Sequence, residues 1–281
     1  MTQKRNVTWF VILTVAFSWP LFLLPLAVPG SAGVAWMLAM FGPGLAAIVV
    51  IRFIARESLS SLNLKRLGPR RFYAWAWLLP PALSVAALGF TLLFGVGIFD
   101  TTFAIVREAL PDEATAVPVT LIVVVQILSA LTFAPLINVV LGAMGEELGW
   151  RGFLLPRLEE LGKCRAILIS SVIWGLWHAP IILQGHNYPG RPVLGIFLMV
   201  GWCVLLGVVL SWLYFATRSP WAPALAHGSV NATAGLPMLF LVPGVDMVWG
   251  GTLASVSGWI GLALFAVWLV ATGRLPIPWR E

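Results

Sequence analysis

The sequence predicts an all-α protein, a polytopic bundle of membrane-spanning helices. Of its 281 residues, 60% are hydrophobic and only 10% are charged, and the mean hydropathy is +0.95. Soluble domains carry roughly 25% charged residues. Apolar runs of membrane-spanning length recur from one end of the chain to the other, and no separate soluble domain interrupts them. We therefore expect one transmembrane domain over residues 1–281.

About eight spans are predicted. A helix needs about 20 apolar residues to cross the hydrocarbon core, and eight windows near this length lack Asp, Glu, Lys and Arg. They run over residues 7–28, 33–51, 72–99, 117–145, 166–184, 192–217, 220–244 and 247–272. The first window exceeds the apolar run of about 7–15 residues found in signal peptides, so we expect this span to be retained.

The basic residues orient these spans. With a cytoplasmic N-terminus, the inner segments hold 15 of the 17 lysines and arginines, and only Arg107 and Arg191 lie outside. The inner residues are Lys4, Arg5, Arg52, Arg56, Lys65, Arg66, Arg70, Arg71, Arg151, Arg157, Lys163, Arg165, Arg218, Arg274 and Arg280. The positive-inside rule produces such a bias, so we predict that both termini are cytoplasmic. A net charge of +6 spread over short loops sets topology and does not indicate a nucleic-acid partner.

The outer segment 100–116 is acidic, with Asp100, Glu108, Asp112 and Glu113, and it is long enough for a short interfacial helix.

Ionisable residues inside the spans mark the candidate site. A charge at bilayer depth costs about 2.5–3.5 kcal/mol, so such residues are functional candidates. Three clusters qualify: Glu146, Glu147 and Arg151 at the end of the fourth span, His178 in the fifth, and His227 with Asn231 in the seventh. Counted from the nearest inner basic residues, all three fall in the cytoplasmic half of the bilayer. The remaining histidine, His186, is in an outer loop, where we expect a packing or surface role.

The helical spacing assigns roles within each cluster. Glu147 and Arg151 are four residues apart and share a face, whereas Glu146 points about 100° away. One carboxylate is then neutralised, and Glu146 remains free for general-base chemistry on water. His227 and Asn231 are also four apart and could donate hydrogen bonds to an oxyanion.

Other interpretations of these residues stay open. Glu146, His178 and His227 could instead be the three protein ligands of a catalytic Zn²⁺. A structural ion pair, and polar residues that only join helices, also fit the pattern.

The three motifs resemble those of the CPBP (CAAX-protease and bacteriocin-processing, or ABI) family. The stretch GEELGWRGFLLPRLEE, with Glu146-Glu147-x-x-x-Arg151, looks like the bacterial form of the first motif. Trp174-x-x-x-His178 resembles the second motif, with Trp in place of the usual Phe, and His227-x-x-x-Asn231 resembles the third. They occur in family order over residues 145–231, and the first three spans carry no motif.

The resemblance implies an intramembrane endopeptidase related to the type II CAAX-prenyl proteases. Glu146 with His178 would activate water, His227 with Asn231 would stabilise the oxyanion, and Arg151 would hold Glu147. It leaves a metalloprotease and a metal-independent glutamate mechanism open. It also implies a membrane-anchored protein or peptide substrate, prenylated or carrying a leader, and a bacterial plasma membrane protein whose site faces the cytoplasm. A proton-coupled transporter or channel, and a catalytically silent bacteriocin-immunity or scaffold protein, are the alternatives.

Overall fold

The computed structural model describes residues 2–111 and 117–275. Within these residues one isolated bridge joins Phe99 and Leu241, and all the regular elements are helices. The all-α prediction is therefore confirmed. Asp112, Glu113 and Arg280, which entered the charge pattern, lie outside the described residues.

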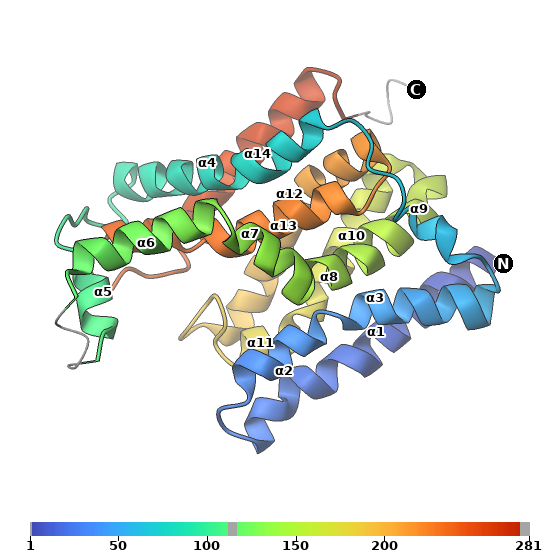
Figure 1. Ribbon diagram of the computed structural model, residues 1–281, viewed down its shortest axis with the longest axis horizontal. Helices are drawn as coiled ribbons and strands as arrows, with labels where there is room; N and C mark the ends of the chain where they lie inside the picture. The colour runs from blue at the N-terminus through green and yellow to red at the C-terminus, as the bar shows by residue number, and fades with distance from the viewer. Residues whose placement is uncertain (1, 112–116, 276–281) are drawn as a thin grey trace.

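Most of the chain is α-helical, and Figure 1 shows the longer helices side by side in one bundle. In chain order the α-helices are α1 (Thr2–Ala27), α2 (Ala32–Ala39), α3 (Gly42–Val49), α4 (Arg71–Leu93), α5 (Ala104–Ala109), α6 (Val119–Leu131), α7 (Ala134–Asn138), α8 (Met144–Gly149), α9 (Leu155–Leu158), α10 (Lys163–Trp177), α11 (Ala179–Leu183), α12 (Pro192–Thr217), α13 (Trp221–Thr233) and α14 (Val256–Ala271). The π-helical turns are η1 (Val50–Ala55), η4 (Val139–Ala143) and η5 (Trp150–Leu154), and the 3₁₀ turns are η2 (Leu59–Leu62), η6 (Glu159–Leu161) and η7 (Leu236–Phe240).

Four helices among the described residues are long and apolar enough to cross a membrane, and a bent pair makes a fifth. They cover Gln3–Ala27, Ala32–Ala55, Arg71–Leu93 and Pro192–Thr217, with Val119–Leu131 and Ala134–Leu161 as the bent pair. Helices α10, α13 and α14 have 15, 13 and 16 residues. At 1.5 Å per residue they are about 20–24 Å long, shorter than a hydrocarbon core of about 30 Å. The number of eight spans therefore stays a prediction.

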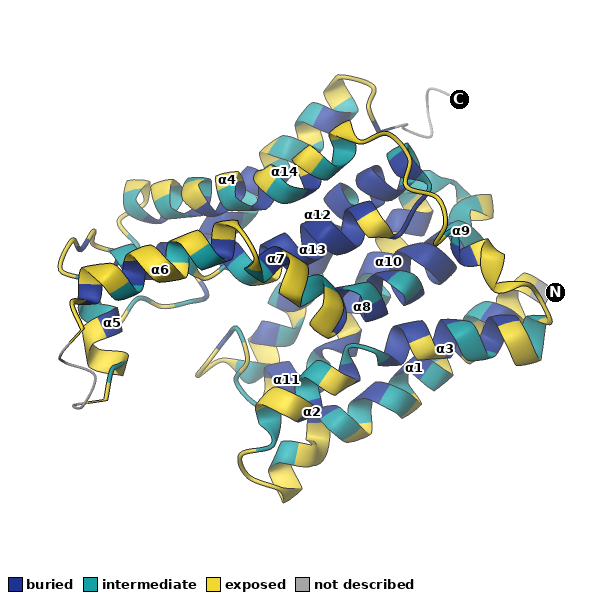
Figure 2. Ribbon diagram, in the orientation of Figure 1, coloured by how far each residue is buried: buried dark blue, intermediate teal, exposed yellow. Residues whose placement is uncertain are grey.

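Large apolar side chains cover the outside of the bundle. Phe53, Val85, Val140 and Phe197 are each more than 70% exposed. Figure 2 shows such exposed positions along the peripheral helices, while α8, α10, α12 and α13 are mostly buried. A bilayer solvates large apolar side chains that would be poorly solvated by water. This surface and the long apolar helices identify an integral membrane protein.

The chain bends repeatedly as it approaches the first motif. The two halves of the bent pair differ in direction by 58°, at a break where Pro135, the second residue of α7, cannot donate a backbone hydrogen bond. Helix α8, which carries both glutamates, then lies between the π-helical turns η4 and η5. Such turns are rare and concentrate at functional sites. Here they set the direction in which the side chains of α8 point.

Two glycines of α8 let it pack directly on α3 and on the turn that precedes α3. A Cβ atom added at Gly149 would lie 2.6 Å from the carbonyl carbon of Pro43, and one added at Gly145 would lie 2.8 Å from the carbonyl oxygen of Met40. Gly145-x-x-x-Gly149 is the spacing that allows close backbone contact between membrane helices. Because Glu146 and Glu147 lie between these glycines, α3 fixes the position of the carboxylates.

We expect Gly149→Ala to destabilise the protein by about 1–3 kcal/mol, because the new methyl group must displace backbone atoms of Pro43. The midpoint of thermal unfolding in detergent measures this. Gly89→Ala is the matched control, since Gly89 is exposed on α4 and a Cβ atom there meets nothing within 4 Å. A Gly149→Ala variant that unfolds no earlier than the control would contradict the close packing of α3 and α8.

Candidate active site

The structure brings the three polar clusters to one cavity of about 600 Å³. Glu146, His178, His227 and Asn231 line it, from α8, the α10–α11 junction and α13. Glu147 and Arg151 do not line the cavity, and lie behind Glu146 in the protein interior, with side chains at most 1% exposed. Apolar side chains, among them several methionines, form most of the remaining wall.

Glu147 is fixed by two partners. Its Oε1 atom accepts a hydrogen bond from Nη1 of Arg151 at 2.8 Å and another from Nδ1 of His227 at 2.9 Å. The predicted ion pair is therefore present, and it extends to α13. Two buried charges stabilise a membrane protein only when their geometry is good and their hydrogen bonds are made. The contact from His227 supplies one of these and ties the first motif to the third.

Glu146 has a different environment. Its Oε2 atom accepts a hydrogen bond from the indole N–H of Trp174 at 2.7 Å, and its side chain reaches the cavity. Arg151 pairs with Glu147, so the donor that holds Glu146 is the neutral indole of Trp174. The helical spacing predicts this division of roles, and the geometry agrees with it.

Trp174 connects the clusters, although the second motif marks it only as an aromatic position. Besides holding Glu146, its carbonyl oxygen accepts from Nδ1 of His178 at 2.9 Å, and the guanidinium carbon of Arg151 lies 4.4 Å from its ring centroid. A phenylalanine would lack the indole N–H. The sequence signal that could have identified this role is a tryptophan, with its indole N–H, one helical turn before His178 and on the same face of the helix.

The hydrogen bonds fix the tautomers of both histidines. A carbonyl oxygen and a carboxylate oxygen only accept hydrogen bonds, so Nδ1 carries the hydrogen in His178 and in His227. In a neutral ring Nε2 then holds a lone pair and can take a proton. His178 is placed to act as a base through Nε2.

Asn231 and His186 also line the cavity. Asn231 lies one turn after His227 on α13 and is exposed to the cavity. His186 lies in the loop after α11, is exposed, and packs edge-on against Trp36 at 5.4 Å between ring centroids. It belongs to the rim of the cavity, away from the glutamates.

The residues present do not form a zinc site in this arrangement. Among the described residues, no group of three His, Cys, Asp or Glu side chains is placed to hold a metal ion. The hydrogen bonds at Nδ1 leave Nε2 of His178 and of His227 free, so it is the placement of the three groups, and not their hydrogen bonding, that does not fit a zinc ion. Zinc therefore stays a prediction.

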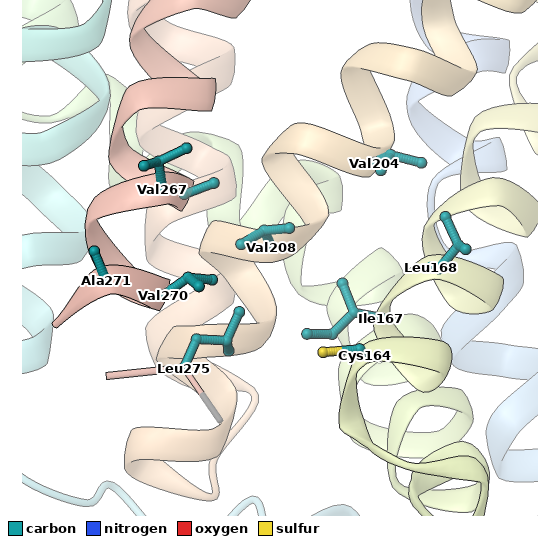
Figure 3. Close-up of a pocket in the computed structure, with 10 residues that line it drawn as sticks. Cys164, Ile167, Leu168, Val204, Val208, Val267, Val270, Ala271 and Leu275 are labelled. Atoms are coloured by element: carbon teal, nitrogen blue, oxygen red, sulfur yellow. The ribbon is translucent and has the colours of Figure 1, made fainter. Parts of the chain in front are cut away.

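A second concave region has no comparable chemistry. A groove of about 420 Å³ between α10, α12 and α14 is lined by aliphatic side chains and Cys164 (Figure 3). It carries no acid, base or amide, so the polar cavity is the candidate active site.

Comparisons with known proteins agree with the motifs. Residues 127–233, which contain all three motifs, match the family described as type II CAAX prenyl endopeptidase Rce1-like. A protein of Methanococcus maripaludis named CAAX prenyl protease 2 is 28% identical over 95 residues, which are 31% of this chain and 34% of that protein. The chain thus matches about a third of the length of this relative. The resemblance to the CPBP and Rce1-like family is confirmed.

We expect Arg151→Met to reduce the free energy of unfolding by about 3–5 kcal/mol, because it leaves the Glu147 carboxylate buried without its cation. The double variant Arg151→Met/Glu147→Gln should recover part of this loss, since it removes the buried charge as well. Detergent-induced and thermal unfolding measure both effects.

Arg191→Met is the control for this prediction. Arg191 pairs with Asp246 at 3.0 Å, but both side chains are more than 40% exposed, and such a pair contributes about 0–1 kcal/mol. Equal effects of the two arginine variants would show that burial of the Glu147–Arg151 pair does not matter.

Proposed function

We propose that this Rce1-like protein is an intramembrane endopeptidase that hydrolyses peptide bonds of membrane-associated substrates. The observation that supports this most is the division of roles between adjacent carboxylates. Glu147 is held by Arg151 and His227. Glu146 accepts a hydrogen bond from the neutral indole of Trp174, and its side chain reaches the cavity. An acid–base pair next to oxyanion donors is what water-dependent acyl transfer requires.

In the proposed mechanism, Glu146 and Nε2 of His178 take a proton from water as it attacks the carbonyl carbon of the scissile bond. The same groups then return a proton to the leaving amine. Asn231 and His227 donate hydrogen bonds to the oxyanion. Because Nδ1 of His227 is bound to Glu147, His227 donates through Nε2 only when its ring is protonated.

The finer topology is also part of this proposal. The bilayer holds eight spans with both termini in the cytoplasm, and residues 1–281 form a single protease domain. The short helices α10, α13 and α14 then span a locally thin or polar region, where adjoining turns and loops complete the crossing. The plasma membrane of a bacterium is the proposed location.

The substrates are proposed as membrane-anchored proteins or peptides, either prenylated or carrying a leader. The relative from Methanococcus maripaludis is named a CAAX prenyl protease, which supports cleavage near a lipid-anchored segment. A proton-coupled transporter or channel is not favoured, because the matched family is one of endopeptidases. A catalytically silent immunity or scaffold protein would not require the set of acid, base and oxyanion donors.

We expect Glu146→Gln and His178→Ala each to reduce cleavage of a membrane-tethered peptide by roughly 100- to 10,000-fold, because each removes a proton acceptor for the attacking water. Purified variants in proteoliposomes provide the assay, with thermal unfolding as a check on folding. Glu108→Gln, which alters an exposed carboxylate on α5, should leave the rate unchanged. Folded Glu146→Gln protein that cleaves at the wild-type rate would refute the mechanism.

The glutamate mechanism predicts that cleavage persists after treatment with a strong chelator. Metal analysis of the protein before and after treatment shows whether any bound metal has been removed. The physical reason is that Glu146, His178 and His227, although they line one cavity, are not placed as a group that could hold a metal ion. Loss of activity with loss of bound zinc, and recovery on adding zinc back, would establish the metalloprotease alternative instead.

A further inference from the structure

The aliphatic groove between α10, α12 and α14 lies on the other face of α12 from the candidate active site. Trp202 lines the polar cavity, and Val204 lines the groove. Two residues along a helix differ by about 200° in direction, so these side chains leave α12 on opposite sides. The groove is therefore separate from the polar cavity, and α12 is the wall between them.

The groove is open to the surroundings of the bundle and apolar down to its base. Leu168 and Val267 on its edges are 51% and 64% exposed, whereas Ile167 and Leu275 are 3% and 4% exposed. Water solvates such a surface poorly. In a bilayer, a hollow of this kind is filled by hydrocarbon.

The shape of the groove suits one hydrocarbon chain. Figure 3 shows Val204 and Val208 on α12, between Leu168 of α10 and Val267 of α14. The two valines of α12 are four residues apart, so the groove follows this helix for at least one turn, about 5.4 Å. A hollow that runs along the helices accommodates an acyl chain that lies parallel to them.

One end of the groove is flanked by arginines. Cys164 and Leu275 line that end, in the lower part of Figure 3, where α10 begins and the chain continues beyond α14. Arg165 follows Cys164 and Arg274 precedes Leu275, and both arginines are exposed. The guanidinium carbon of Arg274 lies 4.4 Å from the ring centroid of Trp268. Tryptophan and arginine together are typical of the level at which a helix meets the membrane surface.

The acids closest in sequence to this end do not cancel its charge. Turn η6, which precedes α10, holds two glutamates. Glu159 pairs with Arg218 at 2.8 Å, so its charge is already compensated, and Glu160 is exposed. Arg165 and Arg274 outnumber this second carboxylate. A positive surface at the end of an apolar groove complements a lipid with an anionic headgroup.

We propose that the groove binds an anionic phospholipid, with one acyl chain along α12 and the phosphate at Arg165 and Arg274. Arginine can donate two parallel hydrogen bonds to phosphate oxygens, and basic pockets between membrane helices hold anionic lipid headgroups. The bound lipid contacts α10, α12 and α14 together, on the face of α12 opposite the candidate active site. This inference goes beyond the proposed protease function and does not depend on it.

A second copy of the chain fits this surface less well than a lipid does. Copies in one membrane have the same orientation, so their basic ends lie at the same depth. In a twofold-symmetric contact through the groove, Arg165 and Arg274 of one copy would lie close to those of the other. Like charges repel, whereas a lipid phosphate attracts both arginines.

Lipid binding to the purified protein in detergent tests the proposal. Native mass spectrometry should show phosphatidylglycerol bound at concentrations where phosphatidylcholine with the same acyl chains binds less. Arg165→Gln/Arg274→Gln should weaken binding of phosphatidylglycerol roughly 10- to 30-fold, because each basic residue adds to the attraction for an anionic lipid. Arg5→Gln/Arg52→Gln, which changes two exposed arginines on α1 and η1, is the matched control and should bind like the wild type. Equal binding of the two lipids, or equal effects of the two double variants, would overturn the proposal.

Val208→Phe tests the apolar part of the site. The added ring occupies the groove, so phosphatidylglycerol binding should be lost, whereas Val85→Phe, at a position 71% exposed on α4, should retain it. A Val208→Phe variant that binds the lipid normally but loses a dimer of the wild type would show an interface between copies and overturn the proposal. Displacement of the lipid by a farnesylated peptide, and not by the unmodified peptide, would assign the groove to a substrate anchor and also overturn it. The arginine variants alter only exposed side chains, so they decide the question even if Val208→Phe does not fold.

Discussion

The buried ion pair between Glu147 and Arg151 is the interaction on which the site depends. Removing two charges from water costs several kcal/mol per ion, which only close partners offset. Arg151 at 2.8 Å, His227 at 2.9 Å and the face of Trp174 provide these partners from three helical segments. Holding one oxygen of the Glu147 carboxylate in this way joins α8, α10 and α13 and leaves the adjacent Glu146 available for chemistry.

Backbone packing gives this arrangement its precision. Gly145 and Gly149 enclose the two glutamates and bring α8 into direct contact with the α2–α3 turn at Met40 and with α3 at Pro43. The π-helical turns on both sides of α8 then determine where its side chains point. Positioning of this kind matters for catalysis, because the reacting groups must be held close to their productive geometry.

Burial is uneven along the cavity, and this places the chemistry in its most enclosed part. Glu146 and Trp174 are 1% exposed, whereas Gly33, His186 and Gly235 line the cavity and are exposed. The turn η5, which follows the glutamates, is buried throughout. Electrostatic interactions are stronger in such an enclosed region than in water, so the hydrogen bonds that hold Glu146 and Glu147 matter most there.

The sequence by itself determined the all-α class, the membrane environment, the family resemblance and the pairing of Glu147 with Arg151, because composition and helical spacing are local properties. It also placed His178, His227 and Asn231 in one group. Only the tertiary structure decided that His227 binds Glu147, that Trp174 holds both Glu146 and His178, and that short, bent helices occupy several predicted windows. These features depend on contacts between segments far apart in the chain, such as Glu147 and His227, and hydropathy and periodicity carry no information about how helices pack against one another.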